Sequence, residues 1–136
     1  IKELDLEEQV RLIPPQPHHI LSTYYRASDI VVVPSKSESF GLVALEAAAC
    51  GTPVVAASVG GLNDLVLHGK TGYLVNERDP KLYAHYAHQI LENPLHAAEI
   101  AMSAVEKAQQ YSWQKTSDQI LDLYASVSSR ALVDCR

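Results

Sequence analysis

Short runs of apolar, mostly β-branched residues alternate along the chain with longer stretches in which apolar residues recur every three or four positions. The first pattern is typical of strands and the second of amphipathic helices. The four predicted strands cover residues 10–13, 30–33, 53–57 and 72–75. Because residues 30–33 are all β-branched, we expect a central parallel strand that is buried on both faces. Strands that alternate with helices in this way predict an α/β domain with a doubly wound parallel sheet, followed by a helical C-terminal tail.

Proline, glycine and short polar residues indicate where the helices begin and end. Asp79 and Asn93 each precede a proline, so both are expected to cap helices that start at that proline. Gly51 is expected to end a helix over residues 40–50. The other predicted helical stretches are residues 19–28, a short piece that ends at Leu65, and the tail that begins at Trp113.

The composition restricts the classes of protein. A length of 136 residues suits one domain, and the 47% hydrophobic and 20% charged residues exclude a disordered chain. The 11 basic and 16 acidic side chains give a net charge of −5, so the basic surplus that nucleic acid binding requires is absent. No apolar run approaches the roughly 20 residues that span a bilayer. Cys50, in an alanine-rich run predicted to be buried, and Cys135 are too few for a disulfide scaffold, and we expect a cytoplasmic protein.

In an open parallel sheet, ligands bind beyond the carboxyl ends of the strands. Three such ends are expected here, at residues 14–17, 34–41 and 58–62. The middle loop leads into a helix, whose unpaired N–H groups and dipole favour an anion. Gly41 would leave these amides accessible to a phosphate, or it would only ease a tight turn between strand and helix. The residues alone leave both interpretations open.

Glu46 is the only charged residue between positions 41 and 51. It is expected on an apolar helical face, where a carboxylate needs a partner or a ligand. A vicinal diol such as ribose would donate two hydrogen bonds to it. Alternatively, Glu46 reaches solvent or pairs with Arg26 or Lys36. The apolar residues expected on the same face are Leu42, Leu45 and Ala49.

An ordered series of motifs resembles one known family. Residues 38–46, ESFGLVALE, resemble the E-x7-E motif of retaining glycosyltransferases with the GT-B fold, in glycosyltransferase family 4 (group 1). On either side, YRASDI, AACGTPVVA, VGGL, GKTGYLV and YSW are similar to further motifs of that family. The similarity implies the C-terminal, Rossmann-like donor-binding domain of a GT-B fold. Within the family, residues 14–17 and 37–43 are most similar to the actinobacterial enzymes that transfer N-acetylglucosamine from its UDP form to inositol phosphate in mycothiol synthesis.

The resemblance implies a role for each matching residue. Glu38 would be the catalytic residue and would bond hydroxyls of the donor sugar, whereas Glu46 would hold the ribose hydroxyls. The loop at Gln16 would contact the nucleotide base through its backbone. No cofactor and no obligatory metal are expected, which agrees with the lack of an Asp-rich metal motif in the sequence. The remaining positions expected to bind the donor are Ser39, Phe40, Gly41, Leu42 and Val43.

The reaction implied by the resemblance transfers a sugar from a nucleotide-diphosphate sugar, with a UDP-sugar favoured, to an acceptor with retention of the anomeric configuration. Family members also have an upstream Gly-Arg strand, a lysine and an N-terminal acceptor domain, which have no counterpart here. We therefore expect a donor-binding fragment that is inactive alone. Any peripheral contact with a membrane would come through the missing domain. The alternative is a non-catalytic nucleotide-sugar binding or interaction module.

A division of the chain follows from the resemblance. Residues 1–112 would form the partial donor-binding domain, and residues 113–136 would form a helix that crosses back toward the missing N-terminal domain, its expected partner. Two strands of the sheet would also be missing. Residues 30–33 would then have an open edge, through which copies of the chain could associate.

Overall fold

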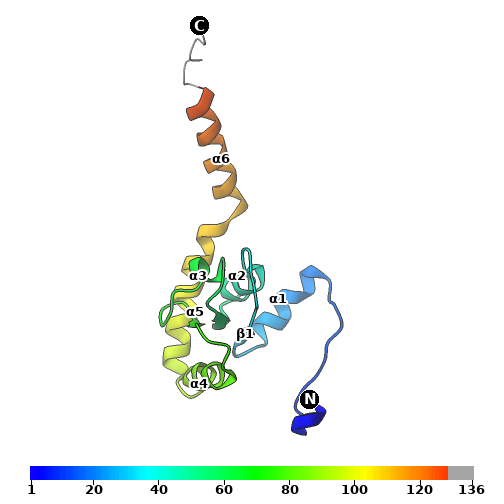
Figure 1. Cartoon of the computed structure of the whole chain (residues 1–136). Coiled ribbons are helices and arrows are strands. Elements are labelled where there is room, and N and C mark those ends of the chain that lie inside the picture. Colours follow the sequence, from blue (N-terminus) through cyan, green and yellow to red (C-terminus); the bar gives the residue numbers. More distant parts are fainter. Residues whose placement is uncertain (129–136) are drawn as a thin grey trace.

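The structure is a computed structural model that describes residues 1–128. Three short strands form a parallel sheet in the middle of these residues (Figure 1). The strands are β1 (Val31–Val33), β2 (Val54–Ala57) and β3 (Tyr73–Val75). β2 lies between the other two, and its Val55 is in register with Val32 on β1 and Tyr73 on β3. All four residues of β2 are buried, so this strand is the centre of the sheet.

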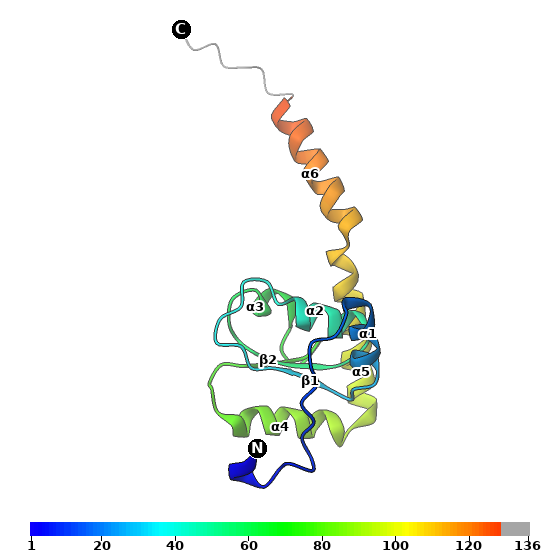
Figure 2. The same cartoon turned by 90° about the vertical axis from the view of Figure 1, so that its right-hand side faces the viewer.

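Helices cover both faces of the sheet (Figure 2). The helices of the described residues are α1 (His18–Arg26), α2 (Leu42–Ala49), α3 (Leu62–Leu65), α4 (Pro80–Leu91), α5 (Pro94–Ala108) and α6 (Trp113–Ser128), with 3-10 turns η1 (Lys2–Leu4) and η2 (Gln109–Tyr111). α2 and α3 lie on one face and α4 lies on the other. A separate cluster of buried apolar side chains fills each interface, one around Val54 and Leu62 and the other around Val55 and Ile90. The doubly wound α/β architecture is confirmed.

The predicted helix ends are confirmed at three places. The Asp79 side chain accepts a hydrogen bond from the N–H of Lys81 over 2.9 Å, and the Asn93 side chain accepts one from the N–H of His96 over 3.2 Å. Gly51 follows α2 with a φ of 78°, in the left-handed region that glycine adopts at helix ends. These ends are set by residues adjacent in sequence, which is why the pattern alone located them.

Two predictions about the strands are wrong. Residues 10–13 form no strand; they are exposed, Leu12 by 82%, and no other strand of the described chain lies in register with them. An extended segment without a pairing partner gains no sheet hydrogen bonds. β1 is not central either, because it lies at one edge of the sheet and Val32 is 45% exposed. The expected open edge is therefore present, but the expected burial on both faces is not.

The C-terminal tail is helical, as predicted, and projects away from the sheet and its covering helices (Figure 1). α6 contains no buried residue, and its first residue, Trp113, is 90% exposed. Cys135, with the rest of residues 129–136, lies outside the described residues. Cys50 is half-buried rather than buried. Within the described chain, no helix combines the length and apolar character that crossing a membrane requires.

Candidate functional site

Two loops meet at the carboxyl end of the sheet, one between β1 and α2 and the other between β2 and α3. The backbone N–H of Gly61 in the second loop donates to the carbonyl oxygen of Glu38 in the first, over 3.2 Å. The approach leaves no room for a side chain, since a Cβ at Gly60 would lie 1.7 Å from that same oxygen. The two glycines thus allow the second loop to hold the backbone of Glu38.

Gly41 is the N-cap of α2 and forms the turn that follows Glu38. Its φ is 98°, and an added Cβ would lie 2.8 Å from Cδ2 of Leu62, so the turn requires glycine. The N–H of Gly41 donates to Oε1 of Glu38 over 3.2 Å, and no side chain among residues 1–128 caps the helix. The first-turn N–H groups of α2 therefore have no side-chain acceptor, and an anion would be favoured there. Both interpretations of Gly41 are compatible with this geometry.

Glu46 lies in the second turn of α2 and has two side-chain partners. The Tyr25 hydroxyl donates to Oε2 over 3.0 Å, and Nε2 of His18 lies 3.0 Å from Oε1. The pairing with Arg26 or Lys36 considered from the sequence does not occur.

The predicted apolar surroundings of Glu46 are present only in part, since Leu45 packs against a buried cluster but the other two predicted residues do not. The buried face of α2 consists of Ala44 and Ala47, whereas Leu42 is 60% exposed and Ala49 is exposed. The Glu46 side chain is 29% exposed and is directed to α1 rather than into the core. Polar side chains of α1 satisfy its carboxylate. The helical pattern within α2 cannot predict these partners, because they belong to another helix.

Tyr25 connects Glu46 to the protein interior. Burial raises the pKa of its hydroxyl to about 12, with further contributions from the hydrogen bond to Glu46 and the charge of that carboxylate. The carbonyl oxygen of Tyr25 accepts a hydrogen bond of 2.6 Å from the Thr52 hydroxyl, and Thr52 is buried. Tyr25 is thus fixed at both its backbone and its ring, and it remains a hydrogen-bond donor at neutral pH.

The other predicted site residues lie around these contacts. Gln16 folds back so that its Nε2 donates to the carbonyl oxygen of Pro14 over 2.9 Å, and its loop leads directly into His18 at the start of α1. The structure therefore brings the Gln16 loop next to Glu46 through His18. Phe40 packs edge-on against Tyr111 with ring centroids 5.9 Å apart. The remaining predicted positions, all exposed, are Ser39, Leu42 and Val43.

The sequence interpretation missed three residues near the site. The helix predicted over residues 19–28 gave neither His18 nor Tyr25 a role at a site, and in the structure His18 is the first residue of α1. Arg78, beyond β3, lines a hollow of about 410 Å³ with Lys36, which follows β1. Local sequence could not predict that these residues lie near Glu46 or Lys36, because each pair is 21 or more positions apart along the chain.

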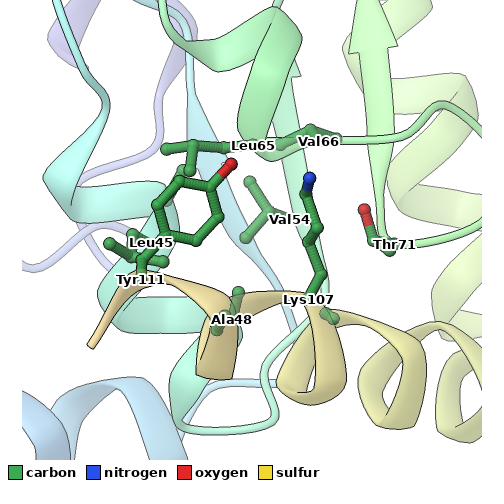
Figure 3. Close-up of a pocket in the computed structure, with 11 residues that line it drawn as sticks. Leu45, Ala48, Val54, Leu65, Val66, Thr71, Lys107 and Tyr111 are labelled. Carbon is green, nitrogen blue, oxygen red and sulfur yellow. The ribbon is translucent and has the colours of Figure 1, made fainter. Parts of the chain in front are cut away.

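A second, small cavity lies inside the domain and takes no part in the site (Figure 3). It measures about 10 Å³ and is lined by side chains of α2, α3, α5 and the sheet, including Leu45, Val54 and Leu65. The amino group of Lys107, on its wall, lies 5.5 Å from the centre of the Tyr111 ring. A space of this size holds at most about one water molecule. It is a gap in core packing rather than a ligand pocket.

Comparison with known proteins gives related sequences over nearly the whole chain. Residues 1–127 match the family model described as "Glycosyl transferases group 1". The D-inositol 3-phosphate glycosyltransferase of Frankia alni is 48% identical over 131 residues, which are 96% of this chain and 32% of that protein. The enzyme of the same name from Thermobispora bispora is 45% identical over 128 residues, 94% of this chain and 30% of that protein. The chain thus spans about a third of the length of the curated relatives it matches.

Solved structures with the same fold include those of two proteins at more than 30% identity. A sucrose-phosphate synthase from Thermosynechococcus elongatus superposes with a TM-score of 0.87 at 37% identity, over 96% of this chain and 33% of that one. The Anabaena protein HepE, in complex with UDP-glucose, superposes with a TM-score of 0.85 at 31% identity, over 92% of this chain and 34% of that one.

Proposed function

We propose, from the premise that the chain belongs to the glycosyl transferases of group 1, that it binds the nucleotide-diphosphate sugar donor of a retaining glycosyltransferase, with a UDP-sugar as the favoured donor. The family predicted from the motif series is confirmed. The observation that carries the proposal is the arrangement at α2, where Glu38 precedes and Glu46 follows a helix N-terminus that has no side-chain cap. That HepE forms a complex with UDP-glucose supports a uridine donor.

The donor would lie along α2 from Glu46 to Glu38. The ribose hydroxyls would donate to the Glu46 carboxylate, with the base beside the loop of Gln16. The diphosphate would accept hydrogen bonds from the backbone N–H groups at Leu42 and Val43, where the helix dipole favours negative charge. The sugar would then reach Glu38, whose Oε1 is fixed by Gly41.

The chemical step breaks the bond between the anomeric carbon and the diphosphate oxygen and forms a bond to the acceptor hydroxyl on the same face. The acceptor proton passes to the departing diphosphate oxygen. The chain's own contribution would be to orient the sugar through Glu38 and to stabilise the charge that develops on the diphosphate with the amides of α2. No step of this scheme requires a metal ion.

Residues 1–112 would form the donor-binding part, and α6 would contact an acceptor-binding domain in a longer protein. Trp113, Leu121 and Tyr124 are each at least 60% exposed, which gives the helix apolar surface for such a contact. The open edge of β1 would be covered by further strands of the same protein. In the chain alone, that edge would favour association between copies.

An NMR titration of the chain with UDP tests the donor site. We expect amide shifts around Gln16 and over residues 38–46, and weaker binding in Glu46→Gln. Glu106→Gln is the matched control, because Glu106 is an exposed glutamate on α5, away from these loops. The proposal is wrong if millimolar UDP causes no shifts, or if Glu46→Gln binds UDP as tightly as the control does.

A further inference from the structure

We infer that Tyr25 is a positioning residue for nucleotide binding: its hydroxyl fixes one oxygen of Glu46, so that the other oxygen bonds the ligand's ribose in place of His18. This inference rests on the proposed function, since it concerns how the same carboxylate is presented to a nucleotide. It adds two residues, Tyr25 and His18, for which the motif gives no role.

The two oxygens of Glu46 have partners of different kinds. Oε2 accepts from the Tyr25 hydroxyl at 3.0 Å, in a half-buried contact between α1 and α2. Oε1 lies 3.0 Å from Nε2 of His18, whose side chain is 85% exposed. A hydrogen bond sheltered from water persists, whereas an exposed pair of this kind contributes little and exchanges readily with solvent. Oε1 is therefore the oxygen available to an incoming hydroxyl.

Tyr25 is anchored independently of the carboxylate that it contacts. Its ring packs against the apolar cluster beneath α2, and its carbonyl oxygen accepts the 2.6 Å hydrogen bond from Thr52, which is 2% exposed. Thr52 follows the end of α2, so the helix that carries Glu46 is tied to Tyr25 at two points. His18 has no comparable support, because it is the first residue of α1 and its ring is in solvent.

Loss of the phenol hydroxyl would leave the carboxylate free to rotate about its last side-chain bonds. A ribose hydroxyl that needs Oε1 in a fixed orientation would then bind less tightly. A nucleotide without ribose hydroxyls would bind equally well with or without the Tyr25 hydroxyl, because it makes no hydrogen bond to Glu46. This difference separates a positioning role from a merely structural one.

The test measures binding of UDP and of 2′,3′-dideoxy-UDP to the 136-residue chain by NMR titration. Tyr25→Phe keeps the packed ring and removes only the hydroxyl, and Tyr24→Phe is the matched control on the same helix. We expect Tyr25→Phe to weaken UDP binding by about 3- to 10-fold, the effect of one hydrogen bond, and to leave dideoxy-UDP binding unchanged. In a Glu46→Gln background, the same substitution should have little further effect. His18→Ala should not weaken UDP binding.

Three results would overturn the inference while the proposed function stands. In the first, Tyr25→Phe weakens the binding of UDP and of dideoxy-UDP equally. In the second, Tyr25→Phe does not change UDP binding, and in the third, His18→Ala abolishes UDP binding. If the unsubstituted chain binds UDP no more tightly than dideoxy-UDP, or Glu46→Gln has no effect, the ribose role of Glu46 is wrong and the inference fails with the proposed function.

Discussion

Replacement of Gly60 by alanine is expected to destabilise the protein far more than the same replacement at Gly69. Both glycines have positive φ angles, 49° and 74°. Each alanine therefore carries a similar cost of about 1–2 kcal/mol for the left-handed conformation. At Gly60 the new Cβ would also lie 1.7 Å from the carbonyl oxygen of Glu38, whereas at Gly69 it meets nothing within 4 Å. The pair thus separates steric overlap from backbone strain.

The loop that carries Glu38 has to move by more than an ångström to relieve the overlap at Gly60. Forced shifts of packed groups cost about 1–3 kcal/mol. We therefore expect Gly60→Ala to lower the free energy of unfolding by about 2–5 kcal/mol and Gly69→Ala by about 1–2 kcal/mol. Because the same movement displaces Glu38, Gly60→Ala should also weaken binding of a UDP-sugar more than binding of UDP.

Urea unfolding followed by far-UV circular dichroism measures both losses of stability. Comparable slopes of the free energy against urea would indicate that the two variants unfold from similar native states. Losses that agree within about 0.5 kcal/mol, the usual scatter for surface substitutions, would refute the close contact between the two loops and with it the placement of Glu38.

Three further predictions concern stability and are each tested by urea unfolding. Asp79→Ala should cost about 1 kcal/mol, because the helix N-cap that accepts from Lys81 is lost; an unchanged midpoint would contradict the cap. The pKa of the Tyr25 hydroxyl is raised from 10.0 to about 12. Above pH 10 the unfolded chain therefore releases the hydroxyl proton before the folded protein does, and the free energy of unfolding falls between pH 10 and 12. That fall should be shallower in Tyr25→Phe and unchanged in Tyr24→Phe. Truncation after residue 112 should change the stability of the remainder by less than about 0.5 kcal/mol, since α6 buries no residue; a loss of several kcal/mol would mean that α6 packs on the domain.

Local sequence located most elements because their causes are local. The proline after Asp79 and the proline after Asn93 start α4 and α5, and Gly51 supplies the left-handed residue that ends α2. The interval between Glu38 and Glu46, with the motifs around it, was sufficient to indicate the family. What remained beyond reach was position within the sheet, since a β-branched run favours a strand whether it lies at the centre or at an edge. For that reason β1 was wrongly predicted to be central, a position that β2 occupies in the structure. Residues 10–13 were likewise predicted to be a strand, but they pair with nothing in the described chain.

The sequence by itself determined which segments become helices, which residues cap them, and that two glutamates flank a glycine at a helix N-terminus. Only the tertiary structure decided what those glutamates contact. Glu46 meets Tyr25 and His18, and Glu38 is held through its carbonyl oxygen by Gly61. The physical reason is that capping and periodicity act within one or two helical turns, whereas a side chain's hydrogen-bond partner depends on how separate helices and loops pack against one sheet.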